Sequence, residues 1–298
     1  MILEVTAPAK LNLVLEVTGR RADGYHEIAS LMQTVDLADA VRLSLADSIE
    51  LEITGEELLG VPREGPRNLA YRAAHALTEA AAETSLGARI EVEKRIPAGM
   101  GLGGGSSDAA AVLRGLNQLW QLDFSLEQLE AIGASVGSDV PFFLHGGACL
   151  VGGRGERVEP LADAITLEAT VFVADVEIDD KTRRMYAALT PADYSDGRRA
   201  HVAAECVRRG LPITEAEMAN AFDRHIGEVA PPLAGARALC KDAGLAVFAC
   251  GSGPAFFTLL PRAEVPALLL RELERDWGVR AIACRSLGRA EATAVRQV

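Results

Sequence analysis

The chain has 298 residues, of which 49% are hydrophobic and 24% charged, so it is typical of a soluble globular protein and long enough for two domains. The net charge of −12 excludes general nucleic-acid binding, because such binding needs a basic face. Five scattered cysteines without a CxxC pair predict reduced thiols, not disulfides or a metal site. The N-terminus lacks a signal-peptide pattern, and no apolar run approaches the ~20 residues that span a bilayer. We therefore expect a cytoplasmic protein that binds neither nucleic acid nor membrane.

The first half of the chain combines strand and helix patterns. β-rich segments predict one strand at 3–17 and two strands around a turn at 40–54. Hydrophobic periodicity predicts a further strand and three helices, at 88–96 (strand), 68–82, 108–120 and 125–137 (helices). Ser106 and Ser107 are the N-cap candidates for the helix at 108–120.

A glycine-broken stretch at 146–161 indicates the passage between an N-terminal domain, residues 1–155, and a C-terminal domain, residues 156–298. The second half then predicts a strand, a mixed helical region, a strand–turn–strand unit, a helix and a last strand, at 169–178, 181–243, 245–260, 265–278 and 279–287. The connection lengths favour largely antiparallel strands. The sequence therefore predicts an α+β protein.

Residues 97–107, PAGMGLGGGSS, are the most informative segment of the chain. Five of the seven positions from Gly99 to Gly105 are glycine, so the backbone has few Cβ atoms and free access to positive φ. Successive N–H groups of such a loop can point into one concavity and bind an anion, and an apolar helix follows directly. The alternative is a flexible surface loop without a ligand, but such linkers are rarely followed directly by a capped helix. The segment predicts a phosphate site.

Two common phosphate motifs do not fit this loop. A P-loop ends in Gly-Lys-Ser/Thr, whereas Ser106 follows Gly105 directly. Residues 99–104 match the dinucleotide pattern, which requires an acidic residue at the end of a second parallel strand. Asp123 has about the right spacing but lies in a turn between two predicted helices. A dinucleotide-dependent oxidoreductase is therefore rejected.

Three further segments carry polar residues in unusual places. Lys10 and Asn12 of APAKLN occupy one face of an apolar strand, where a lysine is costly unless its amine reaches solvent or an anion. Tyr25 and His26 end the turn GRRADGYH, and Asp139 of GSDVPFF stands between a helix end and an apolar run. Each has an ordinary explanation as an edge-strand lysine, a packed tyrosine or a capping carboxylate. Only the presence of all three segments in one chain indicates a function.

Together with CGSGPAFF at 250–257, these segments occur in the order found in the GHMP kinases, which the chain resembles over nearly its whole length. The segments KLNL and GRRADGYH resemble the corresponding segments of the GHMP kinases that act on 4-diphosphocytidyl-2-C-methyl-D-erythritol. The resemblance implies a two-domain fold, with an N-terminal α/β nucleotide-binding domain, a C-terminal α+β domain and the active site in the cleft between them. It also implies transfer of the γ-phosphoryl group of ATP to the tertiary 2-hydroxyl of the methylerythritol moiety, in isoprenoid precursor biosynthesis.

The resemblance assigns the reacting groups and the ATP side of the site. Asp139 would be the catalytic base and Lys10 its cationic partner. Mg²⁺ is expected to bridge phosphate oxygens, with Ser106 or Ser107 as its candidate protein ligands. The alternative interpretation of Lys94 is that it is a solvated surface lysine. The residues expected to bind ATP are Pro97, Gly99, Gly101, Leu102, Gly103, Gly104, Gly105, Ser106, Ser107, Asn68 and Lys94.

On the acceptor side, the resemblance implies that Tyr25 and His26 receive the cytosine. Thr182 and Tyr186 have the family's spacing for the opposite aromatic face, although Asp179-Asp180-Lys181 replaces the small residues usual before the threonine. Asn12 would contact the erythritol portion. Gly251 and Ser252 would shape the substrate pocket, and no histidine close in sequence supports a reactive Cys250.

Two other readings stay open from the sequence alone. One is another GHMP kinase, acting on homoserine or mevalonate, although neither substrate has a base for the GYH segment to stack on. The other is a nucleotide sensor without catalysis, which would not need both Lys10 and Asp139. We expect a small-molecule substrate with a cytidine diphosphate group, no tightly bound organic cofactor, and a monomer or homodimer.

Overall fold

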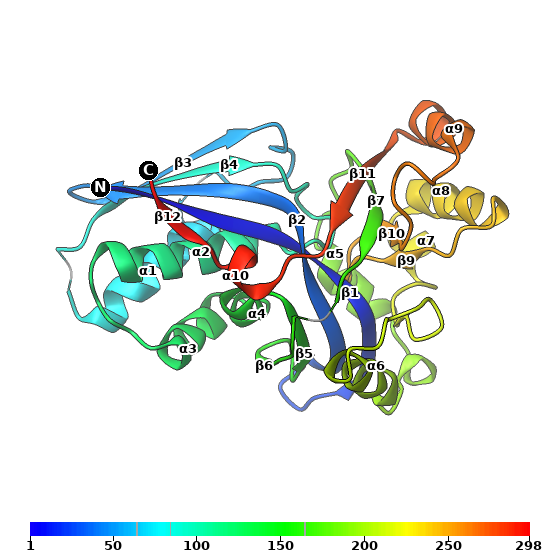
Figure 1. Cartoon of the computed structure of the whole chain (residues 1–298), viewed down its shortest axis with the longest axis horizontal. Helices are drawn as coiled ribbons and strands as arrows, with labels where there is room; N and C mark the ends of the chain where they lie inside the picture. The colour runs from blue at the N-terminus through cyan, green and yellow to red at the C-terminus, as the bar shows by residue number, and fades with distance from the viewer. Residues whose placement is uncertain (64, 84, 164) are drawn as a thin grey trace.

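Two long antiparallel strands joined by a tight turn organise the fold. The structure is a computed structural model that describes residues 1–63, 65–83, 85–163 and 165–298. Strand β1 (Ile2–Arg20) pairs with β2 (His26–Leu45) along nearly its whole length, with three shifts of register. Such irregularities bend a strand and increase its twist. In Figure 1 the pair runs from one half of the molecule into the other, so it connects the two halves.

The larger sheet is built on this pair. Its order is β12-β1-β2-β4-β3, with β5 and β6 extending from β2 and with β8 parallel to β1. Apart from the β1–β8 and β3–β4 pairs it is antiparallel, as predicted. The added strands are β3 (Ile49–Gly55), β4 (Ala88–Lys94), β5 (Ala148–Gly152), β6 (Arg157–Pro160), β8 (Ala219–Asn220) and β12 (Val295–Gln297).

Four helices cover one face of this sheet, below the strands in Figure 1. They are α1 (Leu69–Ala81), α2 (Gly104–Leu119), α3 (Leu126–Val136) and α4 (Val140–His145). Their apolar faces pack with the strands into one core cluster, in which α2 contributes an unbroken buried run from Ala109 to Leu113. Asn68 caps α1, and Ser125 forms a capping box with Gln128 at the start of α3. The sequence analysis predicted the helices α1, α2 and α3, each within a few residues of its observed bounds.

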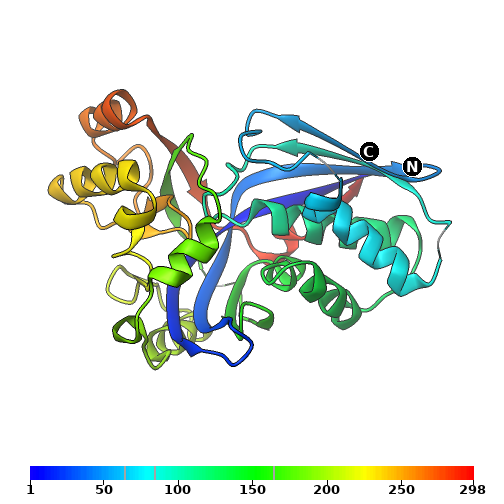
Figure 2. The same ribbon diagram turned by 180° about the vertical axis from the view of Figure 1, so that it is seen from behind.

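The second sheet has the order β11-β7-β10-β9 and is antiparallel. Its strands are β7 (Glu168–Ala174), β9 (Phe248–Ala249), β10 (Phe256–Thr258) and β11 (Val279–Arg285). The helices of this half are α5 (Lys181–Ala188), α6 (Arg198–Arg208), α7 (Ile226–Val229), α8 (Pro231–Asp242) and α9 (Ala267–Trp277). Figure 2 shows α5 in front of the β1–β2 pair, where the two halves meet. The remaining elements are the 3₁₀ turns η1 (Gly65–Arg67) and η2 (Pro191–Asp193), and α10 (Arg289–Ala292).

Several details differ from the sequence-based expectation. Helix α2 begins at Gly104 with Gly103 as its N-cap, so Ser106 and Ser107 lie inside the first turn and are not caps. Residues 148–160 form the β5–β6 pair of the large sheet. The domain boundary after residue 155 stays a prediction. Strand β12 pairs with β1, and the termini lie close together at one end of the large sheet (Figure 1), so the end of the chain returns to its beginning.

The five cysteines are free, and all but Cys206 are buried, as predicted. Burial raises the pKa of the Cys250 thiol to about 12, which agrees with an unreactive Cys250. In the described parts of the chain, every helix is too short or too polar to cross a membrane.

Candidate active site

A cavity of about 1270 Å³ opens between the two halves of the molecule. Its lining includes parts of β1 and β2, the segment before α1, the loop after β4, the starts of α2, α4 and α5, and the β5–β6 and β9–β10 turns. Every residue predicted for the site lines this cavity except Ser107. The volume exceeds that of a usual single-ligand pocket, roughly 300–1,000 Å³, so the cavity is large enough for more than one small ligand. The structure therefore brings together segments that are far apart in the sequence.

At Gly103 the glycine loop is held by contacts that leave no room for a side chain. A Cβ on Gly103 would lie 2.6 Å from the ring of Phe143, and Gly103 adopts the left-handed conformation with φ of 79°. The carbonyl oxygen of Leu102 accepts a hydrogen bond of 3.0 Å from the backbone N–H of Lys10, which ties the loop to β1. Helix α2 then starts at the cavity wall, and Gly104, Gly105 and Ser106 of its first turn line the cavity. The first N–H groups of a helix have no partner within the helix, so this wall suits a phosphate chain.

The two serines of the loop differ in position. Ser106 lines the cavity, whereas Ser107 is fully buried, and its hydroxyl has no hydrogen-bond partner among the described residues. In the part of the chain that is described, no cluster of three or more His, Cys, Asp or Glu side chains could hold a metal. A metal bound mainly through substrate phosphates and water needs no such cluster. Of the two serines predicted as Mg²⁺ ligands, only Ser106 therefore faces the cavity in which a metal would bind.

Lys10 and Asn12 point from the same face of β1, as predicted. The ammonium of Lys10 donates a hydrogen bond of 2.5 Å to Asn12 Oδ1, and Asn12 Nδ2 donates to Ser30 Oγ at 2.9 Å. The Ser30 hydroxyl in turn donates to the carbonyl of Val14, so the amide has a defined orientation. Burial lowers the pKa of Lys10, and the nearby carboxylate of Asp139 partly offsets this effect.

Asp139 occupies the N-cap position of α4, yet its side chain does not cap the helix. Its carboxylate belongs to the cavity lining instead. A Cβ on Gly155 would lie 3.3 Å from Asp139 Oδ1, so the backbone of the β5–β6 turn approaches the carboxylate closely. The predicted capping alternative is therefore wrong for this side chain. The carboxylate of Asp139, which caps no helix, and the buried ammonium of Lys10 therefore both line the cavity.

Lys94 is not a solvated surface lysine, because its side chain is 3% exposed. Its ammonium forms ion pairs with Asp39 and, at 2.7 Å, with Asp108. Burial alone would lower the pKa of Lys94, but the two carboxylates raise it above its ordinary value. Asp39 also accepts backbone N–H groups of Arg95 and Ile96, so the cluster fixes the start of the glycine loop. The ammonium of Lys94 is already paired, and the expected role of Lys94 in ATP binding stays a prediction.

A cluster of aromatic rings also lines the cavity. His26 stacks on Tyr186, with ring centroids 5.0 Å apart and an interplanar angle of 29°, while Tyr194 approaches His26 edge-on at 6.0 Å. Phe222 supports Tyr186 from the side at 4.9 Å. Burial and the charge of Arg20 lower the pKa of His26, so its ring is neutral at pH 7 and can both donate and accept a hydrogen bond. Tyr25 is half exposed and completes a set of rings suited to a flat base.

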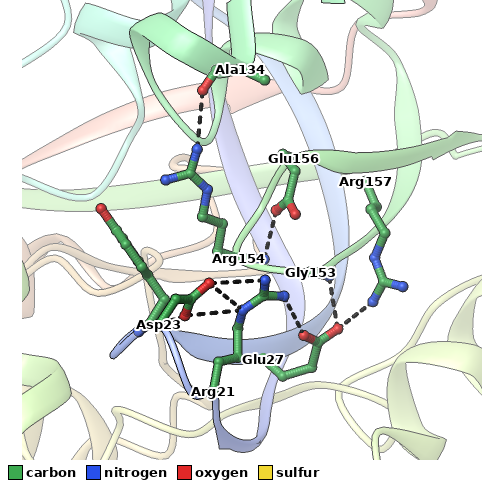
Figure 3. Close-up of polar contacts among 9 residues, drawn as sticks. Arg21, Asp23, Glu27, Ala134, Gly153, Arg154, Glu156 and Arg157 are labelled. Carbon is green, nitrogen blue, oxygen red and sulfur yellow. Dashed lines mark hydrogen bonds and ion pairs between the residues drawn. The ribbon is translucent and has the colours of Figure 1, made fainter. Parts of the chain in front are cut away.

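Figure 3 shows a polar network between the β1–β2 turn, which carries Tyr25, and the β5–β6 turn. The guanidinium of Arg154 lies 5.0 Å from the centroid of the Tyr25 ring and donates to the carbonyl of Ala134 at 3.2 Å. Glu27 pairs with Arg21 at 2.8 Å and also with Arg157. These contacts connect the turn to the β5–β6 loop, so the position of the Tyr25 ring depends on both segments.

Several residues of the cavity lining were not predicted for the site from the sequence, among them Tyr194, Arg154 and Lys181. Tyr194 lies in a polar stretch without periodicity, so no local signal points to it. Arg154 belongs to a glycine-rich segment that was interpreted only as a passage between domains. Lys181 did carry a signal, because it stands where the family pattern has a small residue.

Comparison with known proteins agrees with this geometry. The family model for the N-terminal domain of GHMP kinases matches residues 68–147, and that for the C-terminal domain matches residues 203–279. A 4-diphosphocytidyl-2-C-methyl-D-erythritol kinase of Exiguobacterium sibiricum is 40% identical over 264 residues, which cover 87% of this chain and 89% of that protein. The chain belongs to the GHMP kinases. A protein of the same description from Shouchella clausii is 38% identical to this GHMP kinase over 88% of the chain and 87% of the relative.

Solved structures give the same result for this GHMP kinase. A crystal structure of 4-(cytidine 5'-diphospho)-2C-methyl-D-erythritol kinase superposes with a TM-score of 0.74 at 37% identity, covering 96% of this chain and 99% of the other. The homoserine kinase of Cytophaga hutchinsonii superposes with a TM-score of 0.73 at 19% identity, covering 99% and 97%. At that identity the second likeness shows the fold alone. The expected α+β fold of the GHMP kinases is confirmed.

Proposed function

We propose that this chain transfers the γ-phosphoryl group of ATP to the 2-hydroxyl of 4-diphosphocytidyl-2-C-methyl-D-erythritol. The observation that carries the proposal is that one cavity is lined by a phosphate-type loop, by a lysine and an aspartate, and by a cluster of aromatic rings. A homoserine or mevalonate kinase would have no use for that cluster, because neither substrate contains a base. Relatives described as kinases of this substrate align over most of the chain, which supports the same choice.

In this proposal, different parts of the cavity bind the two substrates. The first turn of α2 and the glycine loop bind the phosphates of ATP, and Asn68 lies on the adenine side. The rings of Tyr25, His26 and Tyr186 hold the cytosine, with Thr182 beside them. Mg²⁺, held through phosphate oxygens and Ser106, would offset negative charge on the phosphates.

Asp139 orients the acceptor hydroxyl and takes its proton, while Lys10 offsets charge on the phosphoryl group. Phosphoryl transfer has a loose transition state, so positioning contributes as much as basicity. The hydrogen bond from Lys10 to Asn12 holds the ammonium on the cavity side of β1. Gly251 keeps that space open, because a Cβ there would lie 2.7 Å from Lys10 Nζ. In this proposal the protein works in the cytoplasm, where free cysteines stay reduced, and it is a monomer or a homodimer.

The experiment that tests this function measures ADP release with ATP and Mg²⁺ in the presence of different acceptors. The acceptors are 4-diphosphocytidyl-2-C-methyl-D-erythritol, homoserine, mevalonate and none. Turnover with the cytidyl compound alone is the expected result. Turnover with homoserine or mevalonate would retain the reaction type and reject the base pocket. ATP binding without turnover of any acceptor would favour a nucleotide sensor.

A further inference from the structure

Lysine is rare in this chain, and its distribution is uneven. Only four of the 30 Lys and Arg residues are lysines: Lys10, Lys94, Lys181 and Lys241. Three of these four line the cavity, and Lys241 is exposed on α8. Lysine differs from arginine in being a compact charge whose pKa shifts readily on burial. A chain that uses arginine at almost every other basic position thus places its lysines at the site. Lys10 and Lys94 have partners already described, whereas Lys181 has no ion-pair partner among the residues that the structure describes.

Lys181 is the first residue of α5, directly before Thr182. Asp180, its neighbour in sequence, pairs with Arg183 instead. In the described ranges, no carboxylate lies within ion-pair distance of the Lys181 ammonium. The charged and titratable groups that face it come from three other elements: Lys10 of β1, Asp139 at the start of α4 and Cys250 before the β9–β10 turn. Lys181 therefore faces the same two groups that the proposed function uses for the reaction.

We propose that the ammonium of Lys181 binds the transferring phosphoryl group as a second cation beside Lys10. The inference rests on the proposed function and adds a catalytic residue to it. Two ammonium groups that share one carboxylate repel each other in the free protein, and an anion between them removes that repulsion. A phosphoryl group in transfer carries its charge on three oxygens, and preorganised cations aimed at them stabilise it.

The electrostatics of the free protein agree with this placement. Burial lowers the pKa of Lys181 to about 8, the charge of Lys10 adds to this effect, and Asp139 and Cys250 oppose it. In the free enzyme Lys181 thus loses its charge as the pH rises through about 8. Because kcat/KM reports the free enzyme, we expect kcat/KM to fall on the alkaline side of that pH. Bound phosphate would restore a high pKa, so kcat should show this limb at higher pH or not at all.

A labelling experiment tests the contact without turnover. The whole protein is treated with a limiting amount of acetic anhydride at pH 8, and acetylation of each lysine is followed by mass spectrometry. We expect Lys181 to be protected several-fold by ATP with Mg²⁺ and less by ADP, while exposed Lys241 is protected by neither. Equal labelling of Lys181 with ATP, with ADP and without nucleotide would overturn the proposal. Protection by the cytidyl substrate alone would also overturn it, since the contact would then be with the acceptor's diphosphate.

Kinetics of variants separate catalysis from structure. Lys181→Ser should lower kcat by about 10²-fold with small changes in both KM values, as for the loss of one charge-stabilising donor. Lys181→Arg should recover part of kcat and move the alkaline limb of kcat/KM upward. Arg184→Ser is the control, because Arg184 is exposed on the same helix and outside the cavity lining. An unchanged kcat in Lys181→Ser, or an alkaline limb of kcat/KM that stays at the wild-type pH in this variant, would refute the assignment. Absence of turnover in the wild type would reject the proposed function instead, and the labelling would still decide the role of Lys181.

Discussion

Gly101 of the glycine loop packs against the backbone of Cys250, which precedes the turn between β9 and β10. A Cβ on Gly101 would lie 1.8 Å from the carbonyl oxygen of Cys250, and the φ of Gly101 is 86°. The phosphate loop of one half of the molecule is therefore seated directly on the CGSGP turn of the other. Gly253 of that turn makes the same kind of contact, because its Cβ would lie 2.0 Å from the carbonyl oxygen of Met100.

This contact predicts different outcomes for two glycines of one loop. Gly99 also has a positive φ, 73°, but a Cβ there would meet no atom within 4 Å. Gly99→Ala should cost only the strain of a left-handed alanine, about 1–2 kcal/mol. Gly101→Ala adds a backbone overlap, so it should lower the free energy of unfolding more and weaken ATP binding. Urea unfolding and ATP titration of both variants would check this, and equal effects would contradict the seating of the loop.

Removal of the charge at Asp139 tests its assignment as the base. Asp139→Asn keeps the shape of the side chain, so turnover should fall by about 10²–10⁴-fold while the affinity for ATP changes little. Steady-state rates and ATP titration on the same preparation give both numbers. Turnover close to that of the wild type would remove Asp139 from the reaction.

The aromatic cluster predicts selective loss of acceptor binding. The side chain of Tyr25 is half exposed, so Tyr25→Ala should leave the fold intact. Loss of one stacking face costs about 1–3 kcal/mol, which corresponds to a rise of roughly 5- to 150-fold in the KM for the cytidyl substrate. The KM for ATP should remain within a few-fold. Equal rises of both KM values would argue against a base at Tyr25.

The buried cluster around Lys94 predicts a pH-dependent stability defect. Lys94→Met leaves the buried carboxylates of Asp39 and Asp108 without their cation, which should cost about 3–5 kcal/mol near neutral pH. Burial already raises the pKa of Asp108, opposed by Lys94. Without the lysine, the folded protein binds protons more tightly than the unfolded chain, so its stability falls as the pH rises.

Urea unfolding at pH 5 and pH 8 measures this defect. The difference between Lys94→Met and the wild type should be larger at pH 8. Lys241→Met is the matched control, since Lys241 is exposed, and it should match the wild type at both values. A defect of the same size at both pH values would mean that packing, and not charge, is responsible.

Local signals predicted much of this architecture. Alternation along β1 placed Lys10 and Asn12 on one face, and the hydrogen bond between their side chains confirms that placement. Periodicity predicted α1, α2 and α3. The start of α2 was wrong because Gly103 adopts a positive φ, which allows the helix to begin at Gly104, before either serine.

Features that depend on contacts distant in sequence were not predictable. Strand β12 is three residues long and exists only because β1 offers it an edge. Tyr194 reaches His26 across the fold from a segment without any pattern. The pairing of Lys94 with Asp39 joins β4 to β2, and nothing local to either residue indicates it.

The most direct test of the account is the position of the new phosphate on the product. The account predicts transfer to the tertiary 2-hydroxyl, whose carbon carries no hydrogen. The ³¹P spectrum of the reaction mixture should therefore show a new phosphomonoester singlet, without three-bond coupling to a carbinol proton, that grows with ADP. A coupled phosphomonoester signal, or ADP formed with inorganic phosphate alone, would contradict the account.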